Sequence, residues 1–119
     1  MPSKHEHITK AEGNASFAKS LSLDNQTRID RALVVLFYAA MHYVEAYLAT
    51  TRQHLRSHAV RDRVLGTEPE LKKVFKEYQD LKFCGYNARY EMYAFTPDDV
   101  TYQALKDFET IKGHLQKFL

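Results

Sequence analysis

Three short stretches of this sequence carry side chains that can do chemistry. They are Tyr38, His42 and Glu45 within a long apolar segment, Ser57-His58-Ala59-Val60-Arg61 within a basic stretch, and Asn87-Ala88-Arg89-Tyr90 after Gly85. Offsets of four and three residues place the first group on one face of a helix. If the groups converge, arginine binds a phosphate or carboxylate, histidine moves a proton near neutral pH, and tyrosine stacks on a base. Such a set predicts a site for a nucleotide or an RNA phosphate.

Each group also has a purely structural interpretation. His42 lies on a mostly apolar segment, which is typical of core-edge histidines whose polar atoms find a partner inside the protein. His58 and Arg61 fit a solvated linker equally well, and His58 also fits a cap for the following turn. Arg89 fits a clamp that stacks on a neighbouring tyrosine ring or pairs with Glu45. Both interpretations stay open at the level of the sequence.

The sequence disfavours several other kinds of site. There is no glycine-rich phosphate-binding loop, and the single cysteine, Cys84, has no context typical of a nucleophile-elbow hydrolase. His5 and His7 form a short pair that is typical of weak metal binding rather than of a dedicated site. No His-Glu-x-x-His motif occurs, and no Glu-x-x-His pair is repeated on two helices. We therefore expect no metal site and no cofactor.

The composition is that of an ordinary soluble globular protein. Its 119 residues fit one domain with a single core, and the formal net charge of +2 neither requires nor excludes nucleic acid. One cysteine rules out an internal disulfide and fits a reducing compartment, and the polar N-terminus does not resemble a secretion signal. We therefore expect a cytoplasmic protein without membrane contact. Residues 1–7 are expected to form a flexible N-terminus and residues 8–119 a single domain.

The longest apolar stretch, Ile29 to Ala49, predicts the central helix of the core. Asp24 is the expected cap of this helix. The stretch does not fit a membrane span, because charged residues lie at one end and His42 and Glu45 interrupt it. A weaker amphipathic helix is expected before it, from about Ile8 to Leu21.

Two further helix starts follow a basic connection that covers residues 52–67. Thr67 and Glu70 have the spacing of a capping box around a proline, and Thr96 precedes a proline and two carboxylates. Gly85 is expected to end or kink the third helix, although helical spacing continues beyond it. Strand signals are absent. The predicted fold is therefore all-α, an antiparallel up-and-down bundle of four main helices.

The order of four motifs resembles that of small prokaryotic HEPN-domain proteins. The motifs are FYAAMH at 37–42, SHAVR at 57–61, YQDLKFCGYNARY at 78–90 and FTPDDV at 95–100. The resemblance runs from about residue 8 to the end of the chain. It implies a helical bundle that often dimerises and that belongs to toxin–antitoxin or defence systems. The positions that recur in the most similar sub-group correspond to His42, His58, Arg61, Arg89 and Tyr90.

Some HEPN proteins are metal-independent ribonucleases, and others bind nucleotides, RNA or proteins. The ribonuclease signature is an arginine, four to six residues and a histidine on the late helix. Arg52 and His58 have this spacing, but they lie in the basic connection, and no histidine follows Arg89 within six residues.

The resemblance and the residues together predict a module that binds RNA or a nucleotide. His58, Arg61, Arg89 and Tyr90 would line its cleft, with His42 and Glu45 behind them. One alternative is a ribonuclease toxin that uses His58 with Arg52, Arg61 or Arg89. The other is a non-catalytic homodimer, or the partner of a small protein such as an antitoxin, with the tyrosine-rich surface as its interface. Tyr38 and Asn87 are further candidates for binding.

Overall fold

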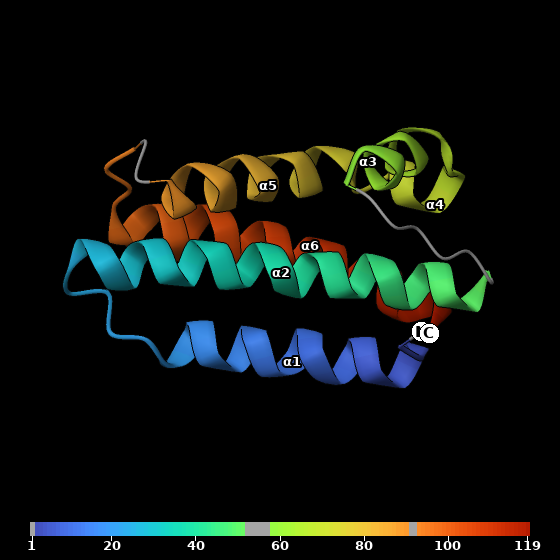
Figure 1. Ribbon diagram of the computed structural model, residues 1–119, viewed down its shortest axis with the longest axis horizontal. Coiled ribbons are helices and arrows are strands. Elements are labelled where there is room, and N and C mark those ends of the chain that lie inside the picture. Colours follow the sequence, from blue (N-terminus) through green and yellow to red (C-terminus); the bar gives the residue numbers. More distant parts are fainter. Residues whose placement is uncertain (1, 52–57, 91–92) are drawn as a thin grey trace.

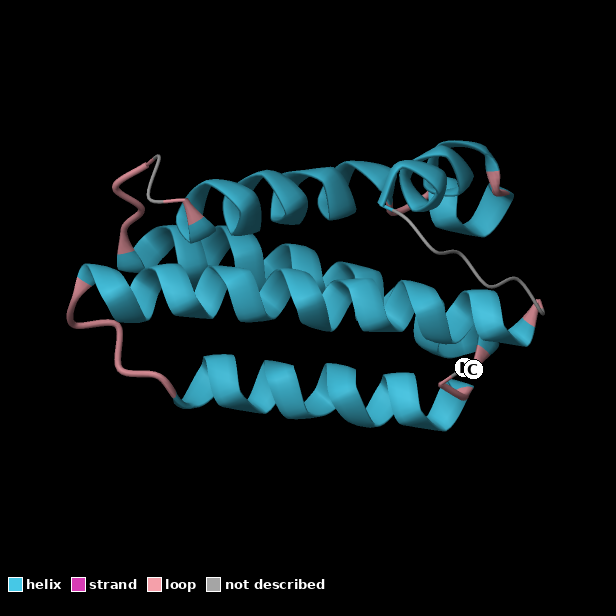
Figure 2. Ribbon diagram, in the orientation of Figure 1, coloured by secondary structure: helices cyan, strands magenta, loops and turns pink. Residues whose placement is uncertain are grey.

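The computed structural model describes residues 2–51, 58–90 and 93–119, and this part of the chain contains helices and no strand. The helices are α1 (Lys4–Ser20), α2 (Gln26–Thr50), α3 (His58–Thr67), α4 (Pro69–Lys72), α5 (Phe75–Arg89), the π-helix η1 (Asp99–Ala104), α6 (Leu105–Leu115) and the 3-10 helix η2 (Gln116–Phe118). Figure 2 shows that helices make up almost the whole drawn chain. The all-α prediction is confirmed.

The longest helix, α2, lies at the centre of the molecule. It is in contact with α1, α5 and α6, which lie beside it along the 41 Å axis of the molecule (Figure 1). Twelve of its side chains are buried: Ile29, Ala32, Leu33, Leu36, Phe37, Ala39, Ala40, Tyr43, Val44, Ala46, Tyr47 and Leu48. Within the described residues, α2 is also the one helix long and apolar enough to cross a membrane, and 61% of its most apolar window is buried inside the protein. The predicted role of this segment as the central helix is confirmed.

The first helix begins four residues before the expected start. Ser3 and Glu6 form a capping box, in which the Glu6 backbone N–H donates to the Ser3 hydroxyl and the Ser3 N–H donates to the Glu6 carboxylate, both at 3.2 Å. This box satisfies two amide groups at the helix start, so residues 4–7 are helical although they are polar. The buried side chains of α1 are all alanines, which allows a close approach to α2.

Two predicted caps are each displaced by one residue. Asn25, rather than Asp24, caps α2 by accepting a hydrogen bond from the Arg28 backbone N–H at 3.0 Å. Glu68, rather than Thr67, caps α4, because its carboxylate accepts from the Leu71 backbone N–H at 2.7 Å. In both cases a neighbouring polar residue has the extended backbone that a cap requires.

The basic connection also contains a helix that the sequence pattern did not predict. This helix, α3, begins at His58 and ends at Thr67, where α4 follows after a single residue. Leu65 is fully buried, and Arg61, one turn before it, is 8% exposed. The sequence pattern did not predict this helix because most of the segment is polar or charged, although Leu65 and Arg61 within it are buried.

The last predicted helix start is confirmed. The Asp99 backbone N–H donates to the Thr96 hydroxyl at 3.2 Å, and the Asp99 carboxylate accepts from the Thr96 backbone N–H at 2.7 Å. This reciprocal pair holds the chain where it enters η1 and then α6. The π-helical geometry of the first turns was not predicted.

Helix α5 continues through Gly85 without a break, because that glycine is the point of closest approach to α2. A Cβ atom added to Gly85 would lie 2.8 Å from the Cβ of Phe37. Glycine is therefore required here for packing, and the helix ends only at Arg89. Phe37 in turn packs edge-on against Tyr78 of α5, with 5.7 Å between ring centroids.

We predict that Gly85→Ala destabilises the protein by about 1 to 3 kcal/mol, the usual range for overpacking a core. Gly113 in α6 is the matched control, because a Cβ atom there meets nothing within 4 Å. Gly113→Ala is expected to stabilise the protein by roughly 0.5 to 1 kcal/mol through helix propensity. Urea unfolding of both variants measures the difference. Equal effects of the two substitutions would contradict the close packing of α2 against α5.

Candidate functional site

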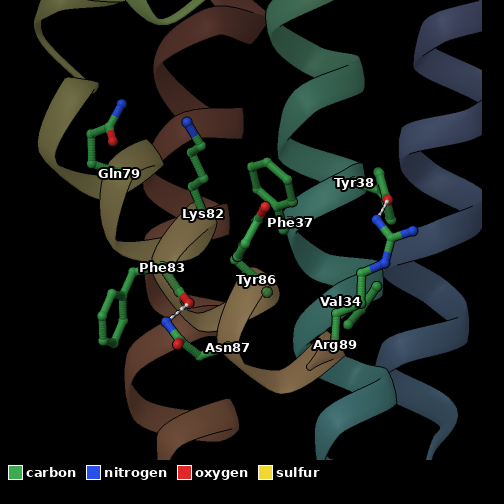
Figure 3. Close-up of a pocket in the computed structure, with 10 residues that line it drawn as sticks. Val34, Phe37, Tyr38, Gln79, Lys82, Phe83, Tyr86, Asn87 and Arg89 are labelled. Carbon is green, nitrogen blue, oxygen red and sulfur yellow. Dashed lines mark hydrogen bonds between the residues drawn. The ribbon is translucent and has the colours of Figure 1, made fainter. Parts of the chain in front are cut away.

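A groove of about 570 Å³ lies between α2 and α5 (Figure 3). Helix α2 contributes one side and α5 the other, and the two helices are held together by the contact between Phe37 and Gly85. The lining residues are Val34, Phe37, Tyr38, Gln79, Lys82, Phe83, Gly85, Tyr86, Asn87 and Arg89. The volume lies within the usual range for small-molecule sites, and the walls combine aromatic rings with two cations and two amides.

Arg89 reaches from the end of α5 across to α2. Its Nη1 atom donates a hydrogen bond to the Tyr38 hydroxyl at 3.2 Å, as Figure 3 shows, and its guanidinium lies 5.7 Å from the centroid of the Tyr90 ring. Arg89 is exposed, and no carboxylate of the described residues forms an ion pair with it. The guanidinium is thus positioned by neutral groups, and its charge is available to an anion.

Aromatic rings form much of the wall of the groove. Tyr86 is 57% exposed, and its ring lies 5.0 Å from that of Tyr90. Phe37 and Tyr38 lie 5.7 Å apart on the α2 side. Exposed tyrosine rings at a groove beside an arginine are typical of surfaces that stack on flat, electron-rich ligands.

Asn87 and Tyr90 have different relations to the groove. The Asn87 side-chain amide donates to the Phe83 carbonyl at 2.8 Å, which fixes its orientation on the α5 wall. Tyr90 does not line the groove, but it lies beside both Tyr86 and Arg89. The structure therefore brings together Tyr38, Asn87 and Arg89, with Tyr90 at the edge.

Arg61 and Glu45 form a separate, buried ion pair. Arg61 Nη2 lies 2.6 Å from Glu45 Oε1, and Arg61 Nε donates to the same oxygen at 2.7 Å. Their side chains are only 10% and 12% exposed. Neither residue lines the groove, so the structure does not bring Arg61 together with Arg89. The pair therefore links α3 to α2.

His42 lies next to α1 instead of α5. Its Nδ1 lies 3.0 Å from Nδ1 of His7, so one ring nitrogen of the pair donates and the other accepts. Burial, helped by the neighbouring His7, lowers the pKa of His42 below its usual value. Because the pKa of His42 is lower in the folded protein than in the unfolded chain, the unfolded chain binds more protons at this site than the folded protein does below about pH 6.5. His42 therefore destabilises the folded state increasingly as the pH falls below that value. At neutral pH His42 is therefore uncharged.

Two candidates lie outside the described part of the chain. Arg52 belongs to the residues that the structure does not describe, and the side chain of His58 is likewise not described, although its backbone begins α3. The predicted convergence of His58 with the arginines therefore stays a prediction.

Several lining residues were missed by the sequence reasoning, namely Val34, Phe37, Gln79, Lys82, Phe83 and Tyr86. Gln79, Lys82, Phe83 and Tyr86 have the helical spacing of one face of α5, whereas Val34 and Phe37 belong to α2. Which helix borders the α5 face is decided by packing.

Comparisons with known proteins leave the family open. No family model matches the chain, and no curated protein or solved structure matches it.

We predict that Glu45→Gln destabilises the protein by about 3 kcal/mol, because it leaves the buried Arg61 charge uncompensated. Replacing both residues by apolar ones of similar size should destabilise far less. Asp24→Asn is the control, since its pair with Arg28 is 3.8 Å long and largely exposed and should matter by less than about 0.5 kcal/mol. A Glu45→Gln effect as small as that of the control, measured by urea unfolding, would show that the pair is not structural.

Proposed function

We propose that this protein binds RNA or a nucleotide in the groove between α2 and α5, as a HEPN-like module whose helices form an antiparallel up-and-down bundle. The observation that carries the proposal is Arg89. It is a cation without a carboxylate partner among the described residues, held by Tyr38 at a groove walled by aromatic rings. A nucleotide joins a flat base to an anionic phosphate, and this groove offers a surface for each.

The two parts of a nucleotide have distinct places in the groove. The base stacks on the exposed ring of Tyr86, with the amides of Asn87 and Gln79 nearby for its polar edge. The phosphate meets Arg89, whose planar guanidinium donates two parallel hydrogen bonds to such oxygens. Lys82 lies on the same wall and adds positive charge.

The chemistry of the lining favours binding over cleavage. Metal-independent cleavage of RNA needs a group that takes a proton from the attacking hydroxyl. Among the described lining residues there is no histidine and no carboxylate. The ribonuclease alternative needs His58 beside Arg52, Arg61 or Arg89, and both Arg52 and the His58 side chain lie outside the described part of the structure. As part of the same proposal, the protein acts in the cytoplasm within a prokaryotic toxin–antitoxin or defence system.

Calorimetric titration with AMP and with a single-stranded RNA of about eight nucleotides tests the proposal. Arg89→Gln is expected to weaken both interactions about tenfold or more, because it removes a charge-assisted hydrogen-bonding group. Arg63→Gln is the matched control, since Arg63 is exposed on α3 and does not line the groove. The proposal is wrong if neither ligand binds, or if both variants bind them equally well.

A second candidate function rests on the exposed aromatic side chains of the same region. Phe83, Tyr86, Tyr90 and Tyr93 are all between 51% and 57% exposed. Their rings pack in two pairs, Phe83 with Tyr93 and Tyr86 with Tyr90. Tyrosine-rich exposed surfaces are favoured at protein interfaces. We therefore keep as an alternative a non-catalytic homodimer, or a complex with a small partner protein, formed through this aromatic face.

Light scattering distinguishes this alternative. If the aromatic face forms a dimer, Tyr86→Ser should shift the molecular mass at micromolar concentration from that of two chains to that of one. Tyr102→Ser provides the control, because Tyr102 is 68% exposed on η1 and is not part of the face. A wild-type protein that is monomeric at every concentration rules out the homodimer.

A further inference from the structure

A second hollow, of about 510 Å³, lies between α1 and α2. Its lining residues are Pro2, His5, Glu6, His7, Thr9, Lys10, Gly13, Asn14 and His42. The single carboxylate among them, Glu6, accepts a hydrogen bond from the Ser3 backbone N–H at 3.2 Å and so completes the cap of α1. The remaining polar side chains are a lysine, three histidines, a threonine and an asparagine. This set can donate hydrogen bonds to an anion.

Lys10 gives this hollow its positive charge. It is exposed, and it makes no ion pair or hydrogen bond within the described part of the chain. It lies close enough to His42 to help hold the pKa of that ring below its usual value. A cation at this place disfavours a bound metal ion and favours a phosphate.

Each of the two hollows is lined by a residue from the same face of α2. Tyr38 lines the groove on the α5 side and His42 lines the hollow on the α1 side, and these residues are one helical turn apart, about 6 Å along the axis. Arg89 of α5 donates a hydrogen bond to Tyr38 (Figure 3), so its guanidinium lies on the α2 side of the groove, at the residue one turn from His42. One strand of nucleic acid that crosses α2 here contacts both.

We propose that the ligand is a single-stranded RNA that crosses α2, with one base in the α2–α5 groove, the adjoining phosphate at Arg89 and a neighbouring phosphate at Lys10 in the α1–α2 hollow. This inference rests on the proposed function and names its ligand class more closely. It assigns Lys10 a contact that a mononucleotide in the groove does not make. The protein should therefore discriminate between an RNA strand and AMP.

The test compares Lys10→Gln with Lys72→Gln, which removes the same charge from an exposed position on α4 away from both hollows. Affinities for AMP and for a single-stranded RNA of about eight nucleotides are measured at several salt concentrations. Lys10→Gln should weaken RNA binding several-fold. It should also reduce the slope of log affinity against log salt by about 0.7, the value for one phosphate contact on a single strand. AMP binding should stay unchanged, and Lys72→Gln should alter neither ligand's affinity.

Two results overturn the inference, and they are separable from failure of the proposed function. If Arg89→Gln weakens RNA but Lys10→Gln behaves like Lys72→Gln, the groove binds its ligand and the α1–α2 hollow plays no part. If Lys10→Gln weakens AMP and RNA equally, both hollows serve one nucleotide and the strand does not extend across α2. If neither AMP nor RNA binds the wild-type protein, the proposed function fails and this inference fails with it.

Discussion

The burial of α2 is the constraint on which the rest of this structure depends. Three helices cover it, and burying its large apolar side chains is the main favourable contribution to folding. The cover is incomplete along one stripe, where Val34, Tyr38, His42 and Glu45 are only partly buried. Tyr38, His42 and Glu45 lie on this stripe, and Arg61 and Arg89 contact it. The groove forms where α5 borders this stripe, the hollow where α1 borders it, and the ion pair where α3 contacts it.

Along this stripe, three polar side chains of α2 have three different partners. Tyr38 accepts a hydrogen bond from Arg89 of α5, His42 shares one with His7 of α1, and Glu45 pairs with Arg61 of α3. The pairs differ in character because their burial differs. The Glu45 pair is enclosed and holds a helix in place, whereas the contact at Tyr38 is open to solvent and leaves a guanidinium available. Residues that share a helix face therefore do not share a partner.

Only part of the candidate site could be predicted from the sequence, and the rest was missed for physical reasons. Tyr38, Asn87 and Arg89 were recognised from residue type and helical spacing, and the groove contains all three. Arg61 was assigned to the same cleft because arginines bind phosphates. In the structure its charge is neutralised by Glu45, a partner 16 residues away in the chain. Which arginine is paired and which is available depends on distances between helices, and spacing along one helix carries no information about those.

The sequence by itself determined that the chain is helical and that residues 29–49 form its centre, because periodicity and apolar content are local properties of the chain. It also determined the cap at Thr96, since a capping box lies within four residues. Only the tertiary structure decided that α5 passes unbroken through Gly85, because the contact with Phe37 that requires glycine joins residues 48 positions apart in sequence. It likewise decided that Arg89 and Lys10 approach α2 from opposite helices, since charges from distant segments come together only when the core has packed.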